Sequence, residues 1–146
     1  VGANLRVLLY GVGLSEEVEL SDELQFKGKF APDDLTLLRG HYGLVWDGEA
    51  ITTCTGRIGE YLKINAPHKA SLYIAAGIPL IVWRHSAIAP YVLEHQLGIA
   101  VDSLLELPER LASIDIAQYT RYREAVQVEQ MKITQGLHLR NIISAL

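Results

Sequence analysis

The chain has 146 residues, of which 49% are hydrophobic and 21% charged, and this balance excludes disordered, fibrous and membrane-embedded classes. The formal net charge of −4 argues against a general nucleic-acid surface, and the single cysteine, Cys54, fits a reducing, cytoplasmic compartment. No apolar run is long enough to be a transmembrane segment, and no signal-peptide layout is present. Because a strand pattern starts within a few residues of Val1, we expect an excised domain of a longer protein.

Five short apolar runs predict strands. They cover residues 5–11, 24–30, 42–48, 78–83 and 99–103, and three of them are nearly continuous in apolar residues, as in strands buried on both faces.

Helices are predicted between these runs. Acidic residues followed by Gly40 indicate a short helix over 31–40, and Pro67 at the first helical position with Gly77 past the end indicates a helix over 67–77. A third helix is expected over 86–98, with Gly98 past its end, and a turn followed by a helix over 104–114. From Asp115 on, a 3.6-residue stripe predicts two closing helices, the second after Gly136.

Strands and helices therefore alternate with short connections. This order predicts an α/β fold with a Rossmann-like parallel sheet flanked by helices, in a single domain over residues 1–146 whose closing helices occupy about 115–146. Ligands of such sheets bind in the crevice beyond the carboxyl ends of the strands. The loops after residues 11, 48 and 84 are therefore the candidate ligand loops.

The start of the predicted helix over 67–77 is electrostatically unusual. In the stretch NAPHKAS, His68 and Lys69 fall in the first turn of a predicted helix, where the helix dipole disfavours a cation by about 0.3–1 kcal/mol. A bound phosphate would reverse that sign, since backbone N–H groups, an ammonium and an imidazole would converge on it. A solvent-facing Lys69 is the plainer alternative.

Other residues near the expected crevice allow two readings each. Gly11 ends a strand in LYGVGL, either as a tight turn or as backbone close to a ligand. Asp47, in WDG, either accepts from a sugar hydroxyl or caps a turn. Tyr42 either stacks on a base or packs in the core, and His41 and His85 are further loop residues.

The sequence motifs of several kinds of catalytic and metal site are missing from this chain. The five histidines show no metal-ligand spacing, no acidic pair of the D-x-D kind is present, and neither a nucleophile elbow nor a phosphate-binding P-loop occurs, so we expect a metal-independent site.

Two longer stretches, HYGLVWDG and YLKINAPHKASLYIAAGIPLIVWRHSAIAPYVLEHQLGIAVDSLLELPERL, carry a resemblance. Together they resemble the C-terminal domain of a family of bacterial GT-B glycosyltransferases, the third glucosyltransferase of serine-rich adhesin glycosylation and the β-1,6-galactofuranosyltransferases. The resemblance implies one half of a GT-B fold, which binds a nucleotide-sugar donor, usually a UDP-sugar. An N-terminal domain, absent from this chain, would bind the glycan or glycoprotein acceptor.

The resemblance also implies roles for individual residues. Asn65 and Lys69 match the motif that meets the donor diphosphate, His68 lies beside them, and Tyr42 is similar to a tyrosine near the nucleotide. Ser86, in the loop after 78–83, is a further expected donor contact. No catalytic residue is assigned, since a general base would come from the other domain or the substrate. The family's arginine after the first strand is missing from LYGVGL.

Two alternatives stay open beside the transferase reading. One is a stand-alone nucleotide- or phosphate-binding regulatory module, and the other is a non-catalytic partner subunit with the same fold. Because an isolated half of a GT-B enzyme exposes its cleft, self-association into a homo-oligomer is also expected.

Overall fold

The structure is a computed structural model that describes residues 5–12, 14–31 and 34–135. The strands are β1 (Val7–Leu9), β2 (Leu24–Phe26), β3 (Gly43–Val45), β4 (Leu80–Trp83) and β5 (Gly98–Val101). The α-helices are α1 (Gly56–Tyr61), α2 (His68–Ala75), α3 (Ala89–Glu94), α4 (Leu107–Ala112) and α5 (Ile116–Thr134), and two 3-10 turns cover η1 (Leu35–Leu37) and η2 (Leu104–Glu106). The predicted α/β class with parallel strands flanked by helices is confirmed.

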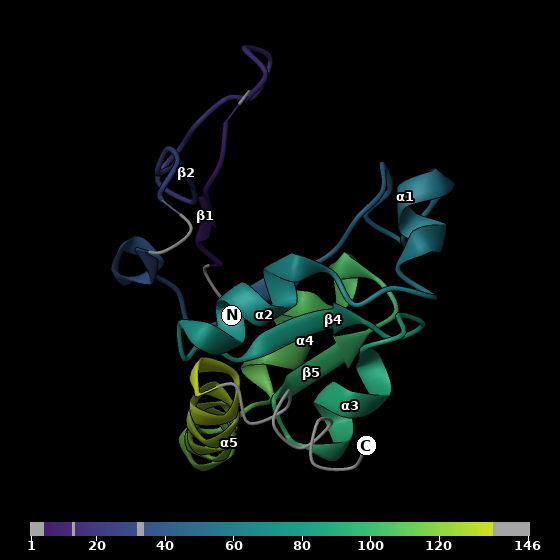
Figure 1. Ribbon diagram of the computed structural model, residues 1–146. Coiled ribbons are helices and arrows are strands. Elements are labelled where there is room, and N and C mark those ends of the chain that lie inside the picture. The colour runs from purple at the N-terminus through teal and green to yellow at the C-terminus, as the bar shows by residue number, and fades with distance from the viewer. Residues whose placement is uncertain (1–4, 13, 32–33, 136–146) are drawn as a thin grey trace.

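The strands form two separate parallel ladders. β3, β4 and β5 pair in chain order, with Val45 opposite Val82 and Trp83 opposite Val101, whereas β1 pairs only with β2. In Figure 1, β1 and β2 stand apart from the layer that contains β4 and β5. The division into two ladders is a feature that the alternation of strands and helices did not predict.

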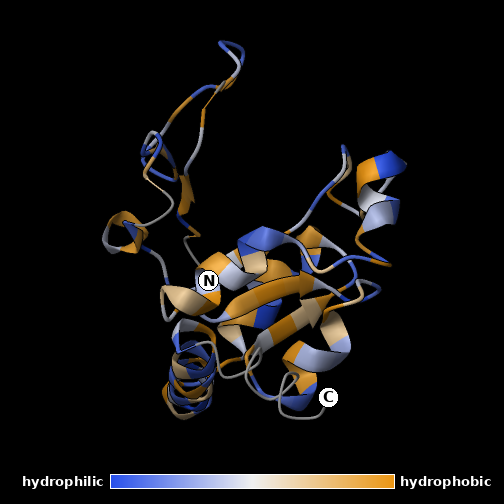
Figure 2. Cartoon of the chain, viewed as in Figure 1, coloured by the Kyte–Doolittle hydropathy of each residue, from blue (hydrophilic) through white to orange (hydrophobic). Residues whose placement is uncertain are grey.

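The core lies on both faces of the β3–β5 ladder. On one face, Val45, Leu80 and Val82 pack with residues of α2, α3 and α5. On the other face, Ile81, Ile99 and Val101 pack against α4 and Tyr122. Every residue of β4 and β5 is buried, and Figure 2 shows these strands as an apolar layer among helices of mixed hydropathy. This explains the continuous apolar runs in the sequence.

Several predicted boundaries shift by a few residues. Pro67 is the N-cap of α2 and not its first residue, so the helix begins at His68. Gly98 does not follow the end of α3. Gln96 takes the left-handed conformation there, with φ of 54°, and Gly98 opens β5 with φ of +153°. A Cβ on Gly98 would lie 1.9 Å from the carbonyl oxygen of Leu80, so this glycine permits close strand pairing.

The C-terminal part contains one long helix among the described residues. Asp115 caps α5 by accepting from the N–H of Gln118 at 2.7 Å. The second closing helix, expected after Gly136, lies outside the described residues. Within the part of the chain that is described, no helix combines the length and apolarity needed to cross a bilayer.

Candidate functional site at the carboxyl edge of the sheet

Polar and charged side chains follow each strand of the larger ladder. Asp47 lies two residues beyond β3, Arg84 and His85 follow β4, and Asp102 follows β5. The parallel register brings the ends of these strands to one edge of the sheet. This is the edge at which doubly wound folds bind their ligands.

Lys69 and Asp47 form the centre of the site. The Lys69 ammonium, in the first turn of α2, lies 2.5 Å from Oδ1 of Asp47 and also donates to the carbonyl oxygen of Trp46 at 3.2 Å. The Lys69 and Asp47 side chains are 36% and 24% exposed, so both reach solvent. Asp47 therefore offsets the unfavourable position of Lys69 at the helix N-terminus.

Asn65 and His68 flank this pair. The N–H of Asn65 donates to the carbonyl oxygen of Tyr61 at 3.0 Å, which fixes the chain between α1 and α2, and the Asn65 side chain is half-buried. His68 is the first residue of α2 and is exposed. Three neighbouring positions of the sequence prediction, Asn65, His68 and Lys69, therefore lie together with Asp47 around the start of one helix.

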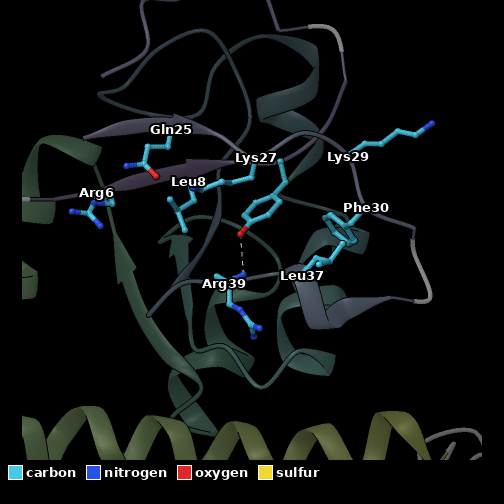
Figure 3. A pocket seen from close by; sticks show the side chains of 9 residues that line it. Arg6, Leu8, Gln25, Lys27, Lys29, Phe30, Leu37 and Arg39 are labelled. Atoms are coloured by element: carbon cyan, nitrogen blue, oxygen red, sulfur yellow. Dashed lines mark hydrogen bonds between the residues drawn. The ribbon is translucent and has the colours of Figure 1, made fainter. Parts of the chain in front are cut away.

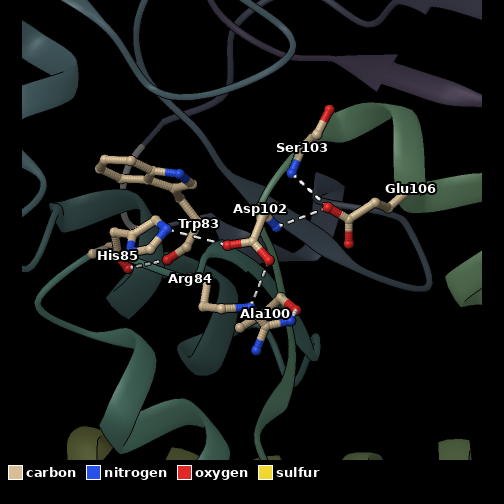
Figure 4. A network of polar contacts seen from close by, with 8 residues as sticks. Trp83, Arg84, His85, Ala100, Asp102, Ser103 and Glu106 are labelled. Carbon is tan, nitrogen blue, oxygen red and sulfur yellow. Dashed lines mark hydrogen bonds and ion pairs between the residues drawn. The ribbon is translucent and has the colours of Figure 1, made fainter.

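A second polar cluster occupies the ends of β4 and β5 (Figure 4). Nε of Arg84 lies 2.9 Å from Oδ2 of Asp102, and Nε2 of His85 lies 3.2 Å from its Oδ1. Arg84 also donates to the carbonyl oxygen of Ala100 at 2.8 Å. These three side chains are between 41% and 61% exposed. The sequence analysis named His85 but missed Arg84 and Asp102, although charged residues directly after buried parallel strands are a usable signal.

Two tryptophans pack behind these clusters. Trp83, 3% exposed, lies in an apolar cluster with Cys54 and Leu62, against which Trp46 also packs. The Lys63 ammonium lies 5.7 Å from the Trp83 ring centroid, a cation–π contact, and burial raises the pKa of the Cys54 thiol. The apolar cluster fixes the loops that carry the charged residues.

The other three sequence-predicted residues are Tyr42, before β3, Ser86, next to His85 at the end of β4, and Gly11, after β1. Tyr42 precedes β3 and so lies at the amino edge of the sheet, where it packs against the cluster of Ile81, Ile99 and Val101. The pKa of Tyr42 is raised to about 12, mainly by burial and further by the neighbouring Tyr122 and Tyr119. Ser86 is buried, and its hydroxyl donates to the carbonyl oxygen of Trp83 at 2.7 Å within a turn. Gly11 follows β1 in the smaller ladder.

Two adjacent cavities extend from Lys69 to the smaller ladder. The first, of about 330 Å³, is lined by Tyr10, Phe30, Leu38, Leu44, Lys69, Leu72 and Tyr73. The second, of about 520 Å³, shares Tyr10 and Phe30 with it. All four basic residues of positions 5–40 line this second cavity (Figure 3), namely Arg6, Lys27, Lys29 and Arg39. Figure 3 shows Lys29 extending away from the others, so its ammonium lies at the rim.

Parallel strands with helices on both faces and charged side chains beyond their carboxyl ends place the domain in the class of Rossmann-like α/β folds. Residues 2–146 match the family described as "Glucosyltransferase 3-like, C-terminal domain", and the chain belongs to this family. The sequence resemblance to this glycosyltransferase family is thereby confirmed.

Two relatives extend the match. The chain is similar to the beta-1,6-galactofuranosyltransferase WbbI of Escherichia coli (strain K12), at 33% identity over 92% of this chain and 41% of the relative. It is also similar to Glucosyltransferase 3 of Streptococcus gordonii, at 30% identity over 75% of this chain and 32% of the relative. The chain thus spans less than half the length of these two relatives. Both are glycosyltransferases by name, so this is a glycosyltransferase-family domain.

Proposed function

We propose that this chain is the donor-binding half of a GT-B glycosyltransferase and that it holds a nucleotide-sugar, of the UDP-hexose kind, for transfer to a glycan or glycoprotein acceptor. The observation that carries the proposal is the placement of the Lys69 ammonium in the first turn of α2 at the carboxyl edge of β3, in a domain of this family. A diphosphate at this place would meet free N–H groups, the helix dipole and a cation.

The chemistry required of such a site is electrostatic. Transfer of a sugar from a nucleoside diphosphate leaves negative charge on the departing diphosphate, and preorganised donors stabilise that charge. Lys69 and the α2 N-terminus would supply this stabilisation without a metal, and His68 could add a further donor. The Arg84–His85–Asp102 cluster, being exposed at the same edge, is the nearest candidate for contacts to the sugar or ribose hydroxyls. The acceptor and any general base would come from outside this domain.

Calorimetric titration with UDP tests the proposal. A charge-assisted hydrogen bond contributes about 1.5–3 kcal/mol, so Lys69→Ala should weaken UDP binding by about 10- to 100-fold. The matched control is Arg121→Ala, which removes a cation on α5 whose guanidinium contacts Gln118 and which should leave UDP affinity unchanged. UDP binding that is unaffected by Lys69→Ala would reject the phosphate assignment. No UDP binding at all would favour a non-catalytic partner subunit.

A further inference from the structure

The positive charge of the N-terminal part of the chain gathers in one cavity. The four basic side chains of residues 5–40 all line the cavity of about 520 Å³, and these four cavity cations are Arg6, Lys27, Lys29 and Arg39. Acidic residues outnumber basic residues in the same stretch, yet no described acidic side chain is in the lining. Charges of both signs are usually interspersed on a solvated surface. This segregation, in a chain of net charge −4, therefore marks a place where an anion is favoured.

The pleat of the smaller ladder explains this arrangement. Successive side chains of a strand point to opposite faces, so Arg6 and Leu8 share one face of the first strand. Gln25 and Lys27 share one face of the second strand, and the parallel register pairs Gln25 with Leu8, so both rows lie on the same face. The N–H of Lys27 donates to the carbonyl oxygen of Leu9 at 2.8 Å, so the ladder continues beyond β2. The alternation in RVLLY and QFKGK thereby becomes one basic face.

Arg39 completes the cavity from a separate segment. It follows η1, and its backbone N–H donates to the hydroxyl of Tyr10 at 3.0 Å, the hydrogen bond drawn in Figure 3. The Tyr10 ring in turn contacts Phe30 edge to face, with the ring centroids 5.7 Å apart. These contacts hold the segment after η1 against the smaller ladder. Cations from both strands and from this segment therefore surround one hollow and are not spread along a flat surface.

The four cavity cations lack counter-charges within the described part of the chain. The ion pairs of that part involve other cations, and no side-chain hydrogen bond among the described residues engages the four. By contrast, Lys69 and Arg84, at the carboxyl edge of the larger ladder, each pair with an aspartate. All four cavity cations are exposed, so their N–H groups can bind a ligand that enters the cavity. A bound anion would also relieve the mutual repulsion of four like charges.

We propose that this cavity binds a sugar phosphate as a second ligand, at a site separate from the one around Lys69. A phosphate monoester carries about two negative charges at neutral pH, and guanidinium groups such as those of Arg6 and Arg39 bind its oxygens in bidentate fashion. Apolar lining from Leu37 and Phe30 suits the C–H face of a sugar ring. The volume of about 520 Å³ lies in the range of small-molecule sites, about 300–1,000 Å³. Membership of a glycosyltransferase family makes a sugar the fitting carrier of the phosphate, and the donor assignment at Lys69 is not needed for this site.

Calorimetric titration of the 146-residue chain with glucose 1,6-bisphosphate tests the site. The double variant Lys27→Ala with Arg39→Ala removes two charge-assisted donors and should weaken binding at least about tenfold. Arg39→Ala keeps the backbone N–H that bonds to Tyr10, so the cavity wall stays in place. The matched control is Arg121→Ala with Arg123→Ala, which makes the same change in net charge on the exposed side of α5 and should leave the affinity unchanged. Equal weakening by the two double variants would reflect net charge alone and overturn the proposal.

Lys69→Ala separates this site from the proposed donor site. The variant should change the bisphosphate affinity by less than about threefold, because screening at about 0.15 M ionic strength limits the effect of a charge outside the cavity. Retained bisphosphate binding supports the site even if UDP affinity proves unaffected by Lys69→Ala, the result that rejects the donor assignment. Loss of bisphosphate binding in Lys69→Ala would place the ligand at the donor site and overturn the proposal. Binding seen only at low ionic strength would indicate an adventitious ion only and would overturn it too.

A comparison with pyrophosphate tests whether the site recognises the sugar as well as the charge. Leu37 lines the cavity and is 54% exposed, so its truncation removes apolar lining without opening the core. Leu37→Ala should weaken glucose 1,6-bisphosphate by about threefold, through lost apolar contact, and should leave pyrophosphate unchanged. Equal effects of Leu37→Ala on the two ligands would reduce the cavity to an inorganic-anion site and overturn the sugar assignment.

Discussion

Replacement of Asp47 by asparagine separates the two roles that this residue can have. Its carboxylate lies 2.5 Å from the Lys69 ammonium. A phosphate oxygen bound to the same ammonium would lie within about 2.8 Å of it, and so within about 5.3 Å of the carboxylate. The carboxylate would then compete for Lys69 and repel the phosphate.

The size of this repulsion follows from the geometry. At about 5.3 Å, two unit charges repel by about 3 kcal/mol at an effective dielectric constant of about 20 and by about 0.8 kcal/mol in bulk water. The partial exposure of Lys69 and Asp47 places the site between these limits. We therefore expect Asp47→Asn to tighten UDP binding by about tenfold, while the loss of a partly exposed ion pair lowers stability by no more than about 1 kcal/mol.

Calorimetry with two ligands makes this result diagnostic. Uridine lacks phosphates, so its affinity should not change in Asp47→Asn if the carboxylate acts only on the diphosphate. If Asp47 instead accepts from a ribose hydroxyl, the variant weakens both uridine and UDP. A weaker or unchanged affinity for UDP would refute the electrostatic reasoning, and the double variant with Lys69→Ala would show whether the two side chains act through each other.

Two further predictions concern stability, and thermal unfolding checks both. Gly98→Ala places a Cβ 1.9 Å from the carbonyl oxygen of Leu80 and should lower the free energy of unfolding by at least about 3 kcal/mol. Gly56→Ala, also at positive φ but with open space around it, should lower it by about 1 kcal/mol. Similar losses of stability in the two variants would show that backbone strain, and not the close approach to Leu80, dominates. The pKa of Tyr42 is raised to about 12, so the neutral phenol stabilises the fold fully below pH 10, and this contribution is lost between pH 10 and 12. Tyr42→Phe should remove that part of the alkaline loss, and it should raise stability at pH 7 because the buried hydroxyl has no partner among the described residues. An unchanged alkaline profile would contradict the assignment.

The sequence predicted the class of fold because continuous apolar runs ending in glycine or in charged residues mark buried parallel strands. It also located Lys69 at the start of a helix, because Pro67 and Gly77 mark the two ends of that helix. It could not predict that the ammonium binds Asp47, 22 residues earlier, because that contact depends on how α2 packs beside the end of β3.

The positions of Tyr42 and Ser86 have equally physical explanations. Tyr42 precedes its strand and therefore lies at the edge opposite the crevice, which the direction of a parallel strand alone could have indicated. Ser86 satisfies its hydroxyl within its own turn, a local geometry that composition does not encode. The division into two ladders could not be predicted from the sequence, because each short strand is equally apolar whether or not another strand pairs with it.

The two tryptophans give the domain a spectroscopic property. The chain contains only Trp46 and Trp83, and both pack beside Cys54 and Leu62 at the carboxyl edge. Intrinsic fluorescence excited at the indole band therefore reports on this edge. A ligand at Lys69 or His85 would change the emission, because Lys69 contacts Trp46 and His85 contacts Trp83. The domain thus carries its own optical probe at the candidate site, without any label.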